Sequence, residues 1–341
     1  MSKNKRIRWI DTARGVGIIL VTLIHSSTYA IRSCNFGTDL LYNFTVAVAV
    51  PIMIFLSGYA VSMSREKYES MTFEAFVKKK FYSLMLQYLV YSLLIYILFT
   101  VAGVLPGFGV LISRAGYGGM GILEFIRGIL VGNNEYSIHV WFLYALFLYE
   151  IIAYMVFKYI RNTGFFVLIS IITLIVTLSY YMSVMSISLA WANGISYFSY
   201  FAFGILFSGK NFGKISGVIS FFCWMSLFFI NMFVIRHNTL IHDIIGIIIP
   251  FFAIAAVSYF SGRIKGNISD KMAVLGRQSM AVYLFQQPFF GSALGTILYT
   301  VLHIPAWVAV LCCAVASLCI PLIIRLIFIK YAWFGKLFAI K

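Results

Sequence analysis

Long apolar stretches recur along the whole chain, and few polar positions interrupt them. The stretch FFVLISIITLIVTLSYYM (165–182) does not alternate between apolar and polar residues, so it predicts a helix and not a strand of a β-barrel. A helix needs about twenty apolar residues to cross the hydrocarbon core of a bilayer. Ten predicted spans meet this requirement: 9–31, 40–62, 81–102, 139–157, 165–182, 190–208, 214–235, 241–260, 279–301 and 306–329.

Basic residues are distributed unevenly between the two sides of these spans. With a cytoplasmic N-terminus, the outer segments hold only Arg32, Arg114, Arg127 and Arg236, and Arg14 lies within the first span. The rest of the 26 lysines and arginines then fall in cytoplasmic segments, as the positive-inside rule requires. The pattern predicts an all-α integral membrane protein, a polytopic bundle of about ten transmembrane helices with both the N- and C-termini cytoplasmic.

The composition excludes a soluble globular protein. Only 11% of the residues are charged and 62% are hydrophobic, with a mean hydropathy of +0.95, whereas about a quarter of a soluble domain is charged. The net charge of +16 is spread over several loops instead of one patch, which argues against a nucleic-acid partner. Basic cytoplasmic loops suit anionic lipid headgroups or the phosphates of a cytosolic cofactor.

The chain reads as one membrane domain, residues 1–341, without an appended soluble domain. It contains no apparent linker, low-complexity segment or internal repeat. The charged segment 64–80 predicts an interfacial helix that leads into the third span. The segment 103–138 is either a functional lid or a plain connection, and ILEFIRGIL within it predicts a short helix. The five cysteines have no metal-ligand spacing, so no metal is expected.

The first span, IDTARGVGIILVTLIHS, carries three ionisable residues. Asp11 and Arg14 are three positions apart and share a helical face. His25 follows Arg14 by eleven residues, which returns to within roughly 20° of that face after a rise of about 16 Å. Gly15 and Gly17 permit close approach by a neighbouring backbone or by a ligand. These charges also favour a retained span over a cleaved signal peptide.

Ionisable residues inside a membrane are costly, so each needs a role or a partner. Asp11 and Arg14 are either functional or an interfacial anchor pair. His25 is either a reactive group or a core histidine bonded to a carbonyl. Glu150, in the fourth span, orients an imidazole, acts as an acid or base, or pairs with a basic residue.

Four local motifs resemble the membrane acyltransferase-3 family. RWIDTARGVGIILVTLIH is similar to its opening signature, in which a basic residue precedes a histidine. PIMIFLSGYAVS (51–62) resembles its Phe-x-x-Ser-Gly-Tyr segment, and HVWFLYALF its Trp-Phe-Leu segment. LGRQSMAVYLFQQPFF (275–290) resembles its late Leu-Gly-x-x-Ser segment. The motifs occur in the family's order, which makes their combination more specific than any one of them.

The resemblance implies transfer of an acyl group, commonly acetyl from cytosolic acetyl-CoA, to a glycan hydroxyl. His25 would act as general base or as a transient acyl carrier. The catalytic set is then His25, Glu150 and Asp11, with Asp11 orienting Arg14. The expected CoA-phosphate contacts are Arg14, Lys78, Lys79 and Lys80. The expected substrate pocket is formed by Ser57, Trp141, Tyr283 and Gln286.

The chain departs from the family pattern at two places. The basic pair that often begins the third span reads Lys80 and Ser83 here, with Gln87 in place of a proline, so one cationic contact is missing. Gln286 stands where the late motif often has a histidine. The expected partners are a polysaccharide or lipid-linked saccharide acceptor, membrane lipids and a separate extracytoplasmic acyl-transfer partner. The expected location is a bacterial cell membrane, as a multi-pass protein.

A secondary transporter or flippase for a glycan or lipid is the alternative function, with Asp11, Glu150 and His25 as proton-relay or substrate groups. The missing repeat and the clustering of ionisable residues on one helix favour the enzyme. A purely structural scaffold leaves the alignment of Arg14 and His25 unexplained.

Overall fold

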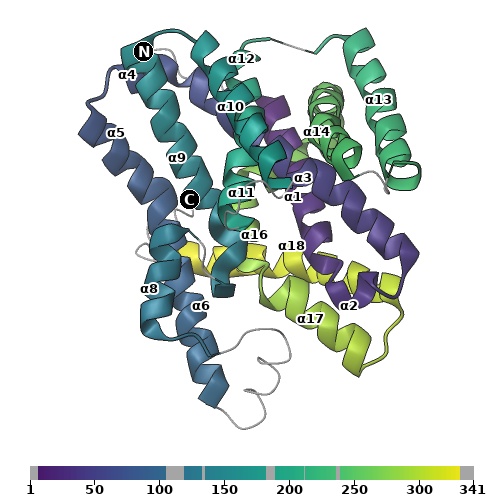
Figure 1. The fold of residues 1–341 in the computed structure, drawn as a ribbon. Coiled ribbons are helices and arrows are strands. Elements are labelled where there is room, and N and C mark those ends of the chain that lie inside the picture. Colours follow the sequence, from purple (N-terminus) through teal and green to yellow (C-terminus); the bar gives the residue numbers. More distant parts are fainter. Residues whose placement is uncertain are drawn as a thin grey trace. The chain divides into compact units, whose positions relative to one another are not determined.

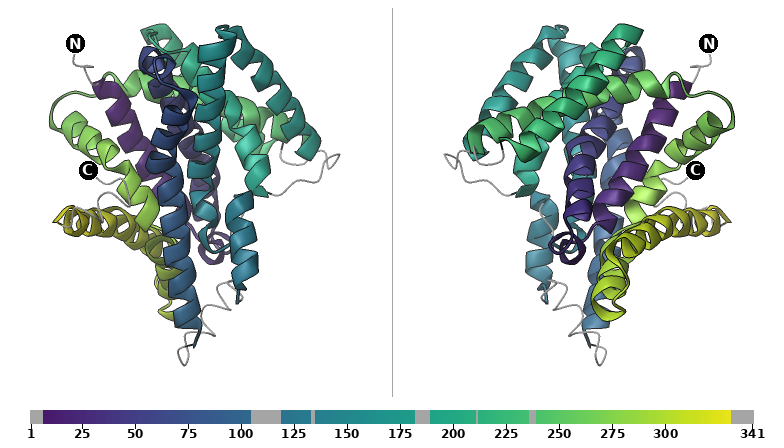
Figure 2. Two further views of the ribbon diagram at one scale, coloured as in Figure 1. Left: turned by 90° about the vertical axis from the view of Figure 1, so that its left-hand side faces the viewer. Right: turned by 90° about the vertical axis from the view of Figure 1, so that its right-hand side faces the viewer.

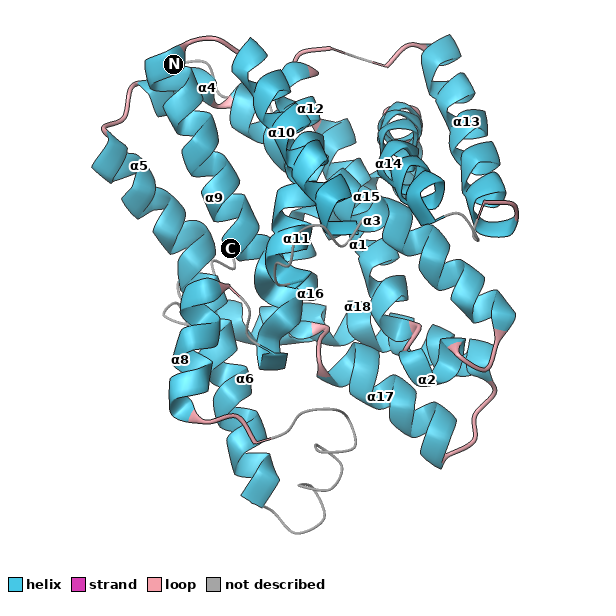
Figure 3. Cartoon of the chain, in the orientation of Figure 1, coloured by secondary structure: helices cyan, strands magenta, loops and turns pink. Residues whose placement is uncertain are grey.

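The computed structural model describes residues 7–104, 119–132, 135–181, 189–210, 212–235 and 239–330. Within these ranges every regular element is a helix (Figures 1 and 3). The predicted all-α class is therefore confirmed for the described part of the chain. Arg114 and Arg236, two of the four outer basic residues, lie outside the described ranges.

Seven of the described helices are long and apolar enough to cross a membrane, and each corresponds to one predicted span. They are Phe36–Met63, Phe73–Val104, Ile138–Ile160, Gly164–Tyr181, Lys214–Phe233, Leu240–Ser261 and Ala306–Lys330. The protein is therefore a multi-pass membrane protein. The count of ten spans and the cytoplasmic position of both termini stay predictions.

The three other predicted spans are more polar, shorter or interrupted. The first becomes α1 (Arg8–Ser26) and α2 (Tyr29–Arg32), and α1 carries the three ionisable residues. The sixth breaks into α11 (Leu189–Ser196) and α12 (Phe198–Leu206). The ninth begins as α16 (Ser279–Phe285) and resumes beyond Pro288 as η4 (Phe289–Ala293), α17 (Leu294–Thr296) and η5 (Ile297–Val301).

Internal contacts divide the chain into two compact units. Unit 1 comprises Met1–Met63, Tyr181–Val184 and Ser199–Ile324. Its other helices are α3 (Phe36–Met63), α13 (Lys214–Phe233), α14 (Thr239–Ser261), α15 (Gly266–Arg277) and most of α18 (Ala306–Lys330).

Unit 2 comprises Ser64–Tyr180, Met185–Phe198 and Arg325–Lys341. Its helices are α4 (Arg65–Glu69), α5 (Phe73–Lys80), η1 (Phe81–Met85), α6 (Leu86–Val104), α8 (Ile122–Val131), η2 (Glu135–Val140), α9 (Trp141–Met155), η3 (Val156–Ile160), α10 (Gly164–Tyr181) and α11. The predicted interfacial helix is α5, but α5, η1 and α6 form one continuous helical run. The short helix expected in ILEFIRGIL is confirmed as α8.

Helix α1 lies at the centre of unit 1, where it packs against α3, α14, α15 and α16. Figure 2 shows α1 (purple) running beside the light-green α15 and α16. The apolar side chains of α1 that face this packing, Ile18 and Val21, form a buried cluster with Ala49 of α3 and Val282 of α16. Within a bilayer such a cluster holds α1 through van der Waals packing, because lipid tails are as apolar as these side chains.

Glycines let α1 and α15 cross with their backbones in contact. A Cβ atom on Gly15 would overlap the Met272 carbonyl, and one on Gly276 would overlap the Asp11 carbonyl. The sequence left open whether Gly15 admits a backbone or a ligand, and here it admits a backbone. The crossing holds the backbone of α1 against Gly276, near the start of the late motif 275–290.

Candidate functional site

Helix α1 is continuous from Arg8 to Ser26, so the spacing argument from the sequence applies to it. Arg14 and His25 are separated by about 16 Å along the helix axis. Asp11 is buried, whereas Arg14 and His25 are half-buried. One helix thus carries two half-buried ionisable residues at different depths.

Asp11 has a partner that sequence reasoning missed. Its carboxylate oxygen lies 3.8 Å from an Arg277 guanidinium nitrogen on α15. Further along the same interface, the Arg8 guanidinium contacts Asp270 at 2.6 Å and donates to Ser269 at 3.1 Å. Arg277 belongs to the late motif LGRQS, and that placement was the signal available in the sequence.

The His25 imidazole makes no hydrogen bond within the described residues. The two hydroxyls nearest to it on α1 are bonded within the helix: Thr22 donates to the Ile19 carbonyl at 2.7 Å, and Ser26 to the Thr22 carbonyl at 2.7 Å. Within the described residues, His25 is therefore not a core histidine bonded to a carbonyl. Both ring nitrogens are free for an incoming group.

The segment from α15 to α17 follows α1 in the same direction. Val282 packs in the cluster of Ile18 and Val21, and Gly291 lies directly against His25. Gln286 falls between Val282 and Gly291, so it lies beside the stretch of α1 that ends at His25. Gln286 is fully buried, and neither polar atom of its amide has a hydrogen-bond partner.

The other two predicted pocket residues of unit 1 are less distinctive. The Ser57 hydroxyl donates to the Met53 carbonyl of its own helix at 2.9 Å. Tyr283 is half-buried and packs against the apolar cluster around α1. Neither contact identifies a ligand.

In unit 2, Lys80 and Glu150 form an ion pair in which each side chain is only 9% exposed. The Lys80 ammonium also donates to the Tyr68 hydroxyl at 2.9 Å. Of the three roles open to Glu150, this arrangement favours pairing with a basic residue. Lys78 and Lys79, by contrast, are exposed.

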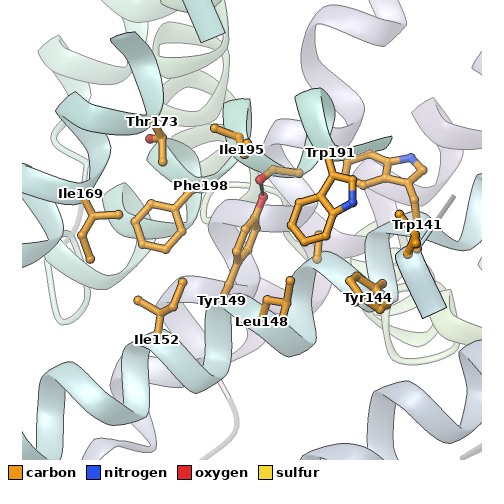
Figure 4. A pocket seen from close by; sticks show the side chains of 14 residues that line it. Trp141, Tyr144, Leu148, Tyr149, Ile152, Ile169, Thr173, Trp191, Ile195 and Phe198 are labelled. Carbon is orange, nitrogen blue, oxygen red and sulfur yellow. Dashed lines mark hydrogen bonds between the residues drawn. The ribbon is translucent and has the colours of Figure 1, made fainter. Parts of the chain in front are cut away.

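Unit 2 also contains a cavity of about 150 Å³, and Trp141 lines it (Figure 4). Its wall combines aromatic rings with aliphatic side chains from α8, α9, α10, α11 and the first residue of α12, among them Tyr144, Tyr149, Trp191 and Ile195. The Trp141 ring stacks on Tyr197 with a centroid distance of 5.6 Å.

Every hydroxyl in the wall of this cavity is already bonded to a backbone carbonyl. Tyr144 donates to Leu130 at 3.2 Å, Thr173 donates to Ser170 at 2.9 Å, and Tyr149 donates to Gly194. The cavity therefore offers apolar surface and suits a hydrocarbon group better than a sugar ring.

A family model described as an acyltransferase domain matches residues 7–326, nearly the whole chain. The chain belongs to the acyltransferase-3 family. Comparison with curated proteins and with solved structures gives no match.

The Phe-Leu-Ser-Gly-Tyr motif of this acyltransferase-3 chain has a clear packing role. Gly58 lies against the Phe201 carbonyl of α12, and the α12 glycine Gly204 lies against the Phe55 carbonyl. The Tyr59 ring meets Trp9 of α1 edge to face at 5.2 Å, and its hydroxyl accepts the Gly209 N–H at 3.2 Å. The Phe-Leu-Ser-Gly-Tyr segment thus joins α1, α3 and α12.

The predicted site residues are divided between the two units of the acyltransferase. Unit 1 contains Asp11, Arg14, His25, Ser57, Tyr283 and Gln286, whereas unit 2 contains Lys78, Lys79, Lys80, Trp141 and Glu150. Within unit 1, His25 and Gln286 lie along the same stretch of α1. Within unit 2, Lys80 and Glu150 are in direct contact.

Proposed function

We propose that this membrane acyltransferase moves acetyl from cytosolic acetyl-CoA to a hydroxyl of a cell-surface polysaccharide or a lipid-linked glycan. The observation that carries the proposal is the His25 imidazole, which is half-buried and free of hydrogen bonds on the helix that also bears Arg14. A free imidazole in a partly enclosed setting suits proton transfer or nucleophilic attack.

As a general base, His25 accepts the proton of the acceptor hydroxyl while its oxygen attacks the thioester carbonyl carbon. The new C–O bond forms, the C–S bond breaks, and the imidazolium returns its proton to the departing thiolate. As an acyl carrier, the ring nitrogen first bonds to the carbonyl carbon while the C–S bond breaks, and the ring proton leaves with the CoA thiolate. The hydroxyl oxygen then attacks the acetyl group, the C–N bond breaks, and the hydroxyl proton returns to the ring. Both routes need a ring nitrogen that has no protein partner.

Arg14 is proposed to bind the phosphates of the donor, because a guanidinium forms charge-assisted bonds to phosphate oxygens. Its distance from His25 along the helix, about 16 Å, leaves room for an extended acyl-carrying arm. Lys78 and Lys79 remain predicted phosphate contacts. Lys80 is withdrawn from that set, since its ammonium is buried against Glu150.

The family match supports the enzyme over the transporter or flippase alternative, because it covers nearly the whole chain and describes an acyltransferase domain. A bacterial cell membrane location, a glycan acceptor and a separate extracytoplasmic partner belong to the same proposal. They follow from the resemblance of the motifs to those of surface-glycan acetyltransferases.

The test replaces His25 with Ala in a cell that makes an acetylated surface glycan, and measures glycan-bound acetate. We expect its loss at normal expression of the protein, and unchanged acetate would remove His25 from the reaction. His303→Asn is the matched control, because His303 is exposed in the same unit and asparagine tolerates its positive φ of 52°. Brief reaction with radiolabelled acetyl-CoA separates the routes, since only the carrier route labels the protein itself.

A further inference from the structure

Gln286 is unusual among the buried polar residues of unit 1. Its side chain is 0% exposed, and both the amide oxygen and the amide nitrogen lack hydrogen-bond partners. Nearly all buried polar groups in proteins are hydrogen-bonded, so a group without partners calls for a functional explanation. An amide that is unsatisfied at both ends is prepared for a ligand that offers an acceptor and a donor together.

The neighbouring Gln287 shows that the local backbone does not prevent satisfaction of a glutamine. Its Oε1 accepts the Ser292 hydroxyl at 2.8 Å. The main-chain carbonyl of Gln286 is also used, since it accepts the N–H groups of Phe290 and Gly291 at 3.2 and 2.9 Å. The lack of partners is therefore confined to the Gln286 side chain.

The position of Gln286 relative to α1 follows from contacts on both sides of it. Four residues earlier, Val282 packs with Ile18 and Val21 of α1; five residues later, Gly291 lies within van der Waals reach of the His25 Cβ. The open amide and the open imidazole therefore lie along the same stretch of α1. Two further open hydroxyls, those of Ser27 and Thr28, follow His25 directly.

We propose that Gln286 is a catalytic residue that binds both reacting groups, an inference that rests on the function proposed above. Its amide N–H donates to the acyl carbonyl oxygen, and its Oε1 accepts the acceptor hydroxyl. A carbonyl and a hydroxyl are one acceptor and one donor, which matches what a free amide provides.

In the transfer step, the hydroxyl oxygen bonds to the carbonyl carbon and the C=O electron pair moves onto the carbonyl oxygen. The amide N–H stabilises that developing negative charge. The hydroxyl hydrogen, which Gln286 Oε1 accepts before the attack, turns to His25, which takes the proton. The C–S bond then breaks, the carbonyl re-forms, and the thiolate receives the proton from His25. An amide stays neutral throughout, so it does not compete with His25 for the proton.

The experiment compares wild type with Gln286→Met, which keeps the side-chain length and removes both polar atoms. Membrane vesicles carrying each variant receive radiolabelled acetyl-CoA, and label in the glycan fraction is measured against donor concentration. We expect the maximal rate to fall about 100- to 1,000-fold, as for loss of an oxyanion donor, with the half-saturating donor concentration within about twofold. A maximal rate like that of wild type overturns the proposal.

Thermal unfolding of the purified, ligand-free protein supplies a readout that does not depend on activity. Gln286→Met is expected to raise the unfolding midpoint, because it removes a buried amide that has no partners. Gln87→Met is the matched control: Gln87 is equally buried and its Oε1 also lacks a partner, but its amide nitrogen donates to the Tyr82 carbonyl at 2.9 Å. That variant should lower the midpoint and keep its maximal rate.

The outcomes distinguish the two levels of inference. An active wild type with an equally active Gln286→Met, or a lowered midpoint in Gln286→Met, overturns the role of Gln286 alone. A wild type that transfers acetyl to no glycan overturns the proposed function and, with it, the role of Gln286.

Discussion

The Lys80 ammonium and the Glu150 carboxylate pair inside unit 2, and each side chain is only 9% exposed. The ammonium also lies 4.6 Å from the centre of the Tyr68 ring. Ions withdrawn from water in this way depend on each other, because either one left alone keeps its full desolvation cost. The pair joins the helical run Phe73–Val104 to α9.

Removing one partner of this pair should therefore destabilise the protein more than removing both. Lys80→Met or Glu150→Leu alone is expected to cost about 3–5 kcal/mol, and the double variant should recover much of that loss. Thermal unfolding of the three variants in one detergent measures this. A double variant as unstable as the worse single variant would contradict the pairing.

The same double variant separates two of the three roles open to Glu150, ion pairing and acid–base chemistry. If Glu150 only pairs with Lys80, the double variant folds and still acetylates glycan. If Glu150 is an acid or base in the reaction, as the sequence-based assignment has it, the double variant folds but transfers no acetyl. Glycan-bound acetate normalised to folded protein decides between them.

Replacing glycine with alanine should change the free energy of unfolding in opposite directions at two positions of unit 1, one inside and one outside the crossing of α1 and α15. Gly276→Ala puts a methyl group into the Asp11 carbonyl, so the helices must separate, at a cost of about 1–3 kcal/mol or more. Gly246→Ala, inside α14, meets nothing within 4 Å and should gain up to about 1 kcal/mol from helix propensity. Unfolding midpoints of the two variants test this, and a neutral Gly276→Ala would disprove the close crossing.

Helical periodicity and hydropathy were enough to predict the all-α class and seven of the spans, because a long apolar helix needs no partner to be identified. They did not predict the interruptions at Tyr197 and near Pro288, where tertiary packing and proline chemistry decide the backbone. The spacing of Arg14 and His25 was predictable for the same local reason.

Contacts between distant segments were beyond the reach of periodicity. The contacts of Arg277 with Asp11 and of Lys80 with Glu150 depend on which helices become neighbours. The periodicity of a single sequence does not reveal those neighbours. Gln286 was predicted as a pocket residue through the family resemblance. Its unbonded amide is a property of the three-dimensional packing alone.

Arg14→Ala is expected to weaken donor binding without altering the bound reaction. Loss of a charge-assisted bond costs about 1.5–3 kcal/mol, which corresponds to a roughly 10- to 150-fold larger dissociation constant for acetyl-CoA. Arg8→Ala is the control, because Arg8 forms an exposed pair with Asp270 that contributes little. Equilibrium binding of acetyl-CoA to the purified variants measures the effect, and wild-type affinity in Arg14→Ala would remove Arg14 from the donor site.

The cavity beside Trp141 should bind small hydrocarbons in preference to their hydroxylated relatives. Its volume of about 150 Å³ is comparable to that of an apolar cavity able to hold benzene. Because the Tyr144, Tyr149 and Thr173 hydroxyls are already bonded to carbonyls, a ligand hydroxyl finds no open partner among them. We expect benzene to raise the unfolding midpoint, as any ligand specific for the folded state does.

Phenol separates a dry apolar cavity from a polar one. Burying its hydroxyl without a partner costs about 1–3 kcal/mol, so phenol should bind about 5- to 150-fold more weakly than benzene and give a smaller shift at equal concentration. Ala145→Leu, which adds bulk to the cavity wall, should abolish the benzene shift and so control for non-specific partitioning into detergent. Equal shifts with benzene and phenol would mean that the cavity has a free polar partner and accepts a polar group, such as a sugar hydroxyl, after all.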